Sequence, residues 1–222
     1  MKNDGLAPSG TRYRILEAAG EVFAELGFQR ATVRKICQRA GVNLASINYH
    51  FGEKEKLYFE VLKYVRELSM GKHPLQSGLS ESATPEEKLQ NFIHSTLLRI
   101  FDEGKPAWFG KLMTKEMIEP THTFDRFIRE GMLPFTNLLE SIVRELLGSR
   151  FDEDQVRLCC ASIIGQCAHY NHSRSVVARI LQKEIYTPGR IERIANHITQ
   201  FSLNGLRHLA EEKKHGKETS WK

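Results

Sequence analysis

The chain has 222 residues, of which 41% are apolar and 27% charged, and its formal net charge is +5. These values are ordinary for a globular protein, and the length allows one good core, or a small domain that shares a core with a larger one. The mild positive charge permits nucleic-acid binding without requiring it. No stretch approaches the ~20 apolar residues of a membrane helix, and the polar start has no signal-peptide run. We therefore expect a cytoplasmic protein with no membrane partner.

Apolar residues recur at helical spacing along nearly the whole chain, and no segment shows sustained strand alternation. This pattern predicts an all-α fold of about nine helices. After a flexible N-terminus at residues 1–10, the first helix is expected from Thr11 to Leu26, with Gly27 as its stop. Gly20 inside this helix is unusual, because glycine costs about 1 kcal/mol relative to alanine there.

Two short helices and a longer one follow the first helix. Thr32 is expected to cap the second helix, and Gly41 to break the chain after it. Asn43 can then cap a third helix, which runs to about His50. The fourth helix begins near Glu53.

The remaining helices are expected beyond a linker at residues 71–84, which is rich in Gly, Ser and Pro. This linker divides a first domain at 11–70 from a second at 85–211, and a flexible polar tail at 212–222 ends the chain. Start and stop signals place the helices of the second domain: from Pro85 to about Phe101, from Ala107 to Ile118, from Phe124 to Leu147 with a kink at Pro134, after Asp152, and after Pro188.

Residues 32–51 have the features of a helix-turn-helix. Ala40 is small where two helices must approach, Gly41 permits the turn, and Val42 and Ile47 tie the second helix to the first. The exposed face of the second helix would then carry side chains that can bond base edges or pack on a thymine methyl group: Asn43, Leu44, Ser46, Asn48, Tyr49 and His50.

The charge pattern supports DNA binding by this motif. The stretch from Gln29 to Gly52 contains no acidic residue and four basic ones: Arg30, Arg34, Lys35 and Arg39. An unopposed basic patch on a helix-turn-helix is what phosphate contact requires.

The run from Arg14 to Leu62 resembles the DNA-binding domain of the TetR family. The features that carry the resemblance are the Ile-Leu-x-Ala-Ala start at Ile15, Phe23, Gly27-Phe28, Ala31-Thr32, Ile36, Ala40-Gly41-Val42, Tyr49-His50-Phe51 and Lys54-x-x-Leu57. The resemblance implies a homodimer that represses transcription from a palindromic operator and is released by a small-molecule effector. An activator, or a regulator without a ligand, stays open, because both would bind DNA in the same way.

The resemblance also assigns roles to individual residues. Thr32 and the N-terminus of the second helix should touch phosphate, as should Tyr49, His50 and Lys54. The full set expected at the DNA is Thr32, Arg34, Asn43, Leu44, Ala45, Ser46, Asn48, Tyr49, His50 and Lys54. The sequence has Ala45 and Asn48 where the family often has Gly and Tyr. These departures bear on the operator sequence and not on the binding mode.

An effector pocket is expected in the second domain, where Ser162 to Ile180 resembles the C-terminal domain of the CecR/CerR-like subgroup. Family members bind effectors between the helices that here carry an aromatic and Met cluster, with His169 as a polar partner. The expected lining is Trp108, Phe109, Met113, Met117, Phe124, Phe127 and His169. Ordinary core packing explains the same residues equally well.

The last two long helices present apolar faces, which we interpret as a four-helix dimer interface. A helix-turn-helix protein normally needs two copies about one turn of DNA apart. The residues expected at this interface are Ile163, Ile164, Cys167, Ile194, Ile198 and Phe201. Burial within one protomer is the alternative.

Other classes of function find less support. The HExxH, GxSxG, P-loop and dinucleotide glycine patterns are all missing, so an enzyme is not expected. His169 and His172 could hold a metal ion, but no carboxylate or second pair accompanies them, and neither metal nor cofactor is expected. The cysteines contain no CxxC pair and are interpreted as small buried apolar residues. The basic patch argues against a partner-binding module whose helix-turn-helix has decayed.

Overall fold

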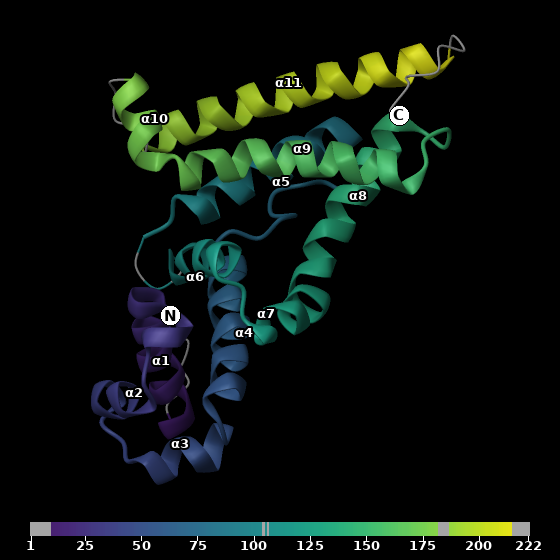
Figure 1. Ribbon diagram of the computed structural model, residues 1–222. Helices are drawn as coiled ribbons and strands as arrows, with labels where there is room; N and C mark the ends of the chain where they lie inside the picture. The colour runs from purple at the N-terminus through teal and green to yellow at the C-terminus, as the bar shows by residue number, and fades with distance from the viewer. Residues whose placement is uncertain (1–9, 104, 106, 182–186, 215–222) are drawn as a thin grey trace, which may run out of the picture. The chain divides into compact units, whose positions relative to one another are not determined.

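The computed structural model describes residues 10–103, 105, 107–181 and 187–214, and every regular element in them is helical (Figure 1). The predicted all-α fold is thus confirmed, and none of the described helices is long and apolar enough to cross a membrane. The elements are α1 Thr11–Arg30, α2 Val33–Ala40, α3 Leu44–Phe51, α4 Lys54–Lys72, α5 Pro85–Ile100, α6 Ala107–Ile118, α7 His122–Phe127, a π-helical turn Ile128–Met132, α8 Leu133–Leu147, α9 Glu153–His172, α10 Arg174–Leu181 and α11 Pro188–Lys214.

The helices form two compact units. The first unit contains residues 1–71 and 103–131, and the second contains residues 72–102 and 132–222. These units differ from the predicted domains at 11–70 and 85–211, because α6 packs against α1 and α7 contacts α4. The expected flexible N-terminus at 1–10 lies outside the described residues except for Gly10. The expected tail at 212–222 does so except for the last turn of α11.

The core of the first unit lies between α1, α2, α4 and α6. Gly27 has φ 76° and ψ 170°, which interrupts α1 where the sequence predicted a stop, and one further turn ends at Arg30. Gly20 lies inside α1 against the indole ring of Trp108 on α6. A Cβ atom at Gly20 would lie 2.8 Å from Cε3 of that ring, so α1 needs glycine at this point of close approach.

Local capping signals begin the helices of the second unit. Thr84 forms a capping box with Glu87 at the start of α5, and Asp152 forms one with Gln155 at the start of α9. Helices α5, α8, α9 and α11 pack together around fully buried side chains such as Leu89.

The segment expected to be one kinked helix from Phe124 to Leu147 consists instead of α7, the π-helical turn and α8. A Cβ atom at Gly131 would lie 2.7 Å from the Phe127 ring, so the π-helical turn has room only for glycine there. Pro134 lies in the first turn of α8, where its missing N–H is not needed. Helix α10 was not predicted as a separate element.

Candidate nucleic-acid interface

The helix-turn-helix is built by local hydrogen bonds and a small core. Thr32 Oγ1 accepts a hydrogen bond from the backbone N–H of Lys35 at 3.2 Å, which caps α2. Gly41 ends α2 in the left-handed region, at φ 63° and ψ 42°. Ala40 and Ile47 are buried where α2 meets α3. The predicted caps and turn are therefore confirmed.

Asn43 caps α3, and this limits what it can offer to DNA. Its Oδ1 accepts hydrogen bonds from the Ser46 backbone N–H at 2.9 Å and from Ser46 Oγ at 3.0 Å. The carbonyl oxygen of Asn43 and the hydroxyl proton of Ser46 are thus used within α3. What remains for base edges is the Asn43 NH₂ group and the acceptor capacity of the Ser46 oxygen.

One face of α3 is open to solvent although it carries large side chains. Leu44 is 55% exposed and Tyr49 is 85% exposed, while Ile47 on the opposite side is buried. Ala45 and Asn48 are exposed beside them. We call Leu44, Ala45, Asn48 and Tyr49 the α3 face. The Tyr49 ring makes an edge-on contact with His50, with ring centroids 5.1 Å apart.

The basic patch next to this face is smaller than the sequence predicted. Arg39 Nη1 lies 2.5 Å from Glu21 Oε1, and the other guanidinium nitrogen lies 3.8 Å from Glu25. The hydrogen bond and charge of Glu21 raise the pKa of Arg39. The interpretation of Arg39 as an unopposed base is therefore wrong, because the acids of α1 reach it from outside the 29–52 window. Their spacing of four residues was the signal, since it places both on one face of a helix.

Three exposed bases of the patch form no ion pair among the described residues. One is Arg30, whose Nε donates to the Leu26 carbonyl oxygen at 3.1 Å. The other two are Arg34 and Lys35. They lie in the first turn of α2, one and two residues after its hydrogen-bonded start. The N-terminal end of a helix itself favours anions. This end of α2 therefore combines free backbone N–H groups with two unpaired cations, which suits a phosphate group.

Lys54, the first residue of α4, lies on an aromatic ring. Its Nζ is 4.3 Å from the centroid of Phe28, the residue after Gly27. Partial burial lowers the pKa of Lys54, and the nearby Glu55 opposes this effect. An ammonium group on a ring face keeps N–H donors for a second acceptor such as a phosphate oxygen.

The residues expected to bind an effector are only partly brought together. Phe109 lies edge-on to the fully buried Phe127, with centroids 6.4 Å apart, and Met113 is buried. Trp108 packs on Gly20 and Phe124 is half-buried, while Met117 is 61% exposed. All six lie in the first unit, whereas His169 is an exposed residue of the second, beside Ser173. Their role in ligand binding stays a prediction.

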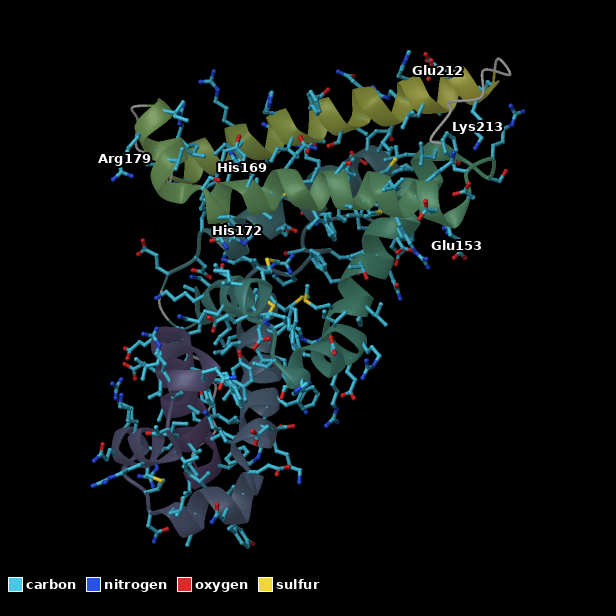
Figure 2. The ribbon with its side chains drawn as sticks, in the orientation of Figure 1. Glu153, His169, His172, Arg179, Glu212 and Lys213 are labelled. Atoms are coloured by element: carbon cyan, nitrogen blue, oxygen red, sulfur yellow. The ribbon has the colours of Figure 1, made fainter. Side chains whose placement is uncertain are left out.

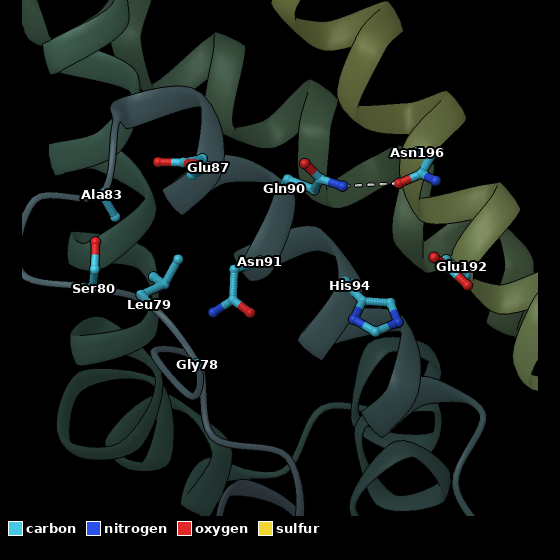
Figure 3. Close-up of a pocket in the computed structure, with 10 residues that line it drawn as sticks. All are labelled: Gly78, Leu79, Ser80, Ala83, Glu87, Gln90, Asn91, His94, Glu192 and Asn196. Atoms are coloured by element: carbon cyan, nitrogen blue, oxygen red, sulfur yellow. Dashed lines mark hydrogen bonds between the residues drawn. The ribbon is translucent and has the colours of Figure 1, made fainter.

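A polar cavity of about 380 Å³ lies in the second unit, between the segment 78–83, α5 and α11 (Figure 3). Gln90 Nε2 donates a hydrogen bond to Asn196 Oδ1 at 3.0 Å and joins the two helices. None of the predicted ligand-binding residues lines this cavity. Its side chains are Leu79, Ser80, Ala83, Glu87, Gln90, Asn91, His94, Glu192 and Asn196.

Helices α9 and α11, which carry the predicted interface residues, lie side by side in the second unit (Figure 2). Ile163, Cys167 and Ile198 are buried within the protomer, so their side chains have almost no surface left for a partner. Ile164 and Ile194 are half-buried. Phe201, in contrast, is 64% exposed. It lies at a groove of about 190 Å³ whose lining includes Leu158, Ser162, Gln166, Gly205 and Leu209.

The cysteines of α9 are buried, whereas His169 and His172 of the same helix are exposed. Burial raises the pKa of the Cys167 thiol to about 12, and burial is also the main reason why the pKa of Cys160 is about 12. Cys37 and Cys159 are also buried, which confirms the interpretation of the cysteines as buried residues. His169 and His172 lie near the end of α9 (Figure 2). No group of three or more His, Cys, Asp or Glu side chains in the described residues could hold a metal ion.

Two family models match the chain. Residues 15–61 match bacterial regulatory proteins of the tetR family. Residues 85–206, more than half of the chain, match the C-terminal domain of the HTH-type transcriptional dual regulator CecR.

Relatives of known function share parts or most of the chain. The HTH-type transcriptional repressor KstR2 of Rhodococcus jostii is 36% identical over 86 residues, which are 38% of this chain and 42% of KstR2. This match therefore spans less than half of that relative. The repressor NicS of Pseudomonas putida is 24% identical over 201 residues, which are 89% of this chain and 92% of NicS.

A similar fold occurs in the crystal structure of the transcriptional regulator FadR from Bacillus subtilis in complex with stearoyl-CoA. The TM-score is 0.65 at 22% sequence identity, and the match covers 87% of this chain and 98% of FadR. At this identity the likeness concerns the fold.

Proposed function

This chain belongs to the TetR family of DNA-binding transcriptional regulators, and on that premise we propose that it is a dimeric, cytoplasmic repressor that a small molecule releases from a palindromic operator. The observation that carries the proposal is the α3 face. Leu44 and Tyr49 remain open to solvent on a short helix, and the unpaired Arg34 and Lys35 lie on the neighbouring helix. An apolar and aromatic surface beside free cations suits a major groove flanked by phosphates.

Within this interface we assign base reading and phosphate contact to different residues. Asn48 is the base reader, because its amide has both a donor and an acceptor for base edges. Its side chain is also exposed on the α3 face. Phosphate contact is assigned to Thr32, Arg34, Tyr49 and Lys54. Loss of a base reader should change sequence preference, whereas loss of a phosphate contact should weaken binding to all DNA alike.

The experiment is a titration of fluorescently labelled promoter DNA from beside the gene of this protein, repeated over a series of salt concentrations. We expect tight binding of a dimer to an inverted repeat. Asn48→Ala should alter the ranking of operator variants, with about 1–3 kcal/mol lost at one base pair. Asn137→Ala, an exposed amide on α8, is the matched control and should leave the ranking unchanged. Uniform loss on every sequence would refute the assignment of Asn48.

Dimerisation is proposed to use the exposed part of the α9 and α11 surface. Phe201 and the groove beside it offer apolar surface that remains uncovered in the protomer. Obligate interfaces are rich in such surface. The predicted interface residues Ile163, Cys167 and Ile198 would support this surface from beneath.

Release by an effector is the third part of the proposal. A shift of the bound population from 99:1 to 1:99 requires about 5.5 kcal/mol of differential binding between the two conformations. The B. subtilis regulator FadR is described in complex with stearoyl-CoA, so stearoyl-CoA is the first probe to add to the preformed complex with DNA. Dissociation of the complex would support a ligand-released repressor.

A regulator that also activates is the second candidate, since the matching C-terminal family model is named after a dual regulator. Both candidates bind DNA through the same face, so binding assays do not separate them. A reporter gene behind the operator does: deletion of the protein raises expression for a repressor and lowers it for an activator.

A further inference from the structure

A carboxylate is buried in the first unit, at the corner between α6 and α7. Glu116 of α6 is only 2% exposed. Tyr58 Oη on α4 donates to Glu116 Oε1 at 2.6 Å, and the Thr121 backbone N–H donates to Oε2 at 2.8 Å. Thr121 Oγ1 adds a hydrogen bond at 3.1 Å. No cation pairs with Glu116 among the described residues, so neutral donors alone compensate the loss of water.

The Tyr58 hydroxyl is a permanent donor to this carboxylate. Burial, with the hydrogen bond and charge of Glu116, raises the pKa of Tyr58 far above its ordinary value, so the hydroxyl keeps its proton. The Tyr58 ring is buried and packs against two further rings. Its centroid is 4.7 Å from that of Phe23 and 5.0 Å from that of Phe28.

From Tyr58 a line of direct contacts leads to the start of α4. Phe28 contacts the Tyr58 ring, and the Lys54 ammonium lies 4.3 Å from the Phe28 centroid. Lys54 and Tyr58 are four residues apart on α4 and therefore share one face of that helix. A rotation of α4 about its axis would move both side chains together.

We propose that Glu116 is a positioning residue for DNA binding. By accepting the hydrogen bond of the Tyr58 hydroxyl, Glu116 fixes the rotation of α4 about its axis and the position of the Phe28 ring. The Lys54 ammonium is thereby held where it can bind a phosphate oxygen. The inference rests on the proposed function, because Lys54 is a phosphate contact only if the α3 face binds DNA.

Thr121 extends the same network to the start of α7. Thr121 precedes α7, and its side chain makes no capping hydrogen bond to that helix. Its N–H and hydroxyl donate to Glu116 instead. The carboxylate therefore joins α4 to the α6–α7 corner, and displacement of this corner would leave the Tyr58 hydroxyl without its acceptor in a buried place, which is unfavourable.

The test compares two tyrosines of α4, of which Tyr58 donates a hydrogen bond to Glu116 and Tyr64 does not. Tyr58→Phe removes the hydroxyl and keeps the ring against Phe28. Tyr64→Phe is the matched control, because Tyr64 Oη donates to Tyr13 Oη at 3.0 Å and does not touch the line of contacts. Glu116→Gln is the second variant, because it keeps the size of the side chain and changes its charge. Operator affinity is measured against salt, and the urea midpoint of each variant is recorded.

We expect Tyr58→Phe and Glu116→Gln to weaken operator binding about 2- to 30-fold, the usual range for coupling through a packed network. The slope of log K against log salt, which is negative, should become less steep by about 0.9, the value for one phosphate contact. Tyr64→Phe should change neither quantity. In a Lys54→Ala background, Tyr58→Phe should cause no further loss, because both changes remove the same contact.

Three results would overturn the inference. Unchanged affinity in a folded Tyr58→Phe dimer would do so, as would losses that add to that of Lys54→Ala. An equal loss in Tyr64→Phe would show a general effect of lowered stability. Absence of operator binding by the unchanged protein would instead overturn the proposed function, which keeps the two failures apart.

Discussion

Replacement of Gly20 by alanine should destabilise the protein, although the same change stabilises most helices. In an open helix interior alanine is favoured over glycine by about 1 kcal/mol. Here the new Cβ atom would lie 2.8 Å and 2.9 Å from Cε3 and Cζ3 of Trp108, with Val65 Cγ1 at 3.7 Å. The Trp108 ring would have to move by several tenths of an ångström. Overpacking of this kind costs about 1–3 kcal/mol, so we expect a net loss of about 0–2 kcal/mol.

The assay is urea unfolding followed by far-UV circular dichroism, with Gly110→Ala as the matched control. Gly110 lies on α6, two residues from Trp108, and an added Cβ there meets nothing within 4 Å. This control should gain about 0.5–1 kcal/mol. In a Trp108→Leu background, Gly20→Ala should also become stabilising. Equal gains for Gly20→Ala and Gly110→Ala in the unchanged background would refute the packing of Trp108 on α1.

Three further predictions concern charge, pH and assembly. Arg34→Ala should lower the slope of log K against log salt by about 0.9, whereas Arg39→Ala should lower it much less, because Glu21 already neutralises Arg39. An equal change in slope for the two variants would mean that Arg39 also contacts phosphate, as the sequence predicted. Cys160 and Cys167 have pKa values raised from 9.0 to about 12 in the folded state, so unfolded thiols ionise first and the free energy of unfolding should fall as pH rises from 9 towards 12. Urea titrations at several pH values check this, and alanine at both cysteines should flatten the decline. Phe201→Glu should give monomers in sedimentation velocity and weaken operator binding, and a persistent dimer would place the interface elsewhere.

The parts of the fold that depend on neighbours in the sequence were predictable. The caps at Thr32, Asn43, Thr84 and Asp152 are local, because each side chain bonds a backbone N–H three residues ahead. Helix α6 also begins and ends where the sequence predicted, at Ala107 and Ile118. The α3 face also follows from local rules, since helical spacing alone separates its exposed residues from the buried Ile47.

Contacts between residues far apart in the sequence could not be predicted from local sequence patterns. The sequence showed that Gly20 was costly in a helix but not that Trp108 required it, since the two residues meet only in the folded unit. Helical spacing likewise marks the apolar faces of α9 and α11 without saying which neighbour covers them. Ile198 is covered within the protomer and Phe201 is not, although both were expected at the same interface.

The composition of the first unit bears on how a signal from an effector would reach DNA. Segment 103–131, assigned from the sequence to the effector domain, holds α4 along its length. Glu116 binds Tyr58, Arg126 lies 4.1 Å over the Phe59 ring, and the Gly131 carbonyl accepts a hydrogen bond from Arg66 at 2.7 Å.

These contacts join α4 to α6, α7 and the π-helical turn within one compact unit. A motion that slid α4 past α6 would break them and leave the buried Tyr58 hydroxyl and Glu116 carboxylate without one another, at about 1–3 kcal/mol for each buried group left unpaired. A motion of the unit as one body breaks none of them. If the α6–α7 aromatic residues do line the effector site, the lower-cost response to a ligand is therefore a shift of the whole first unit, with Lys54 and the α3 face carried along.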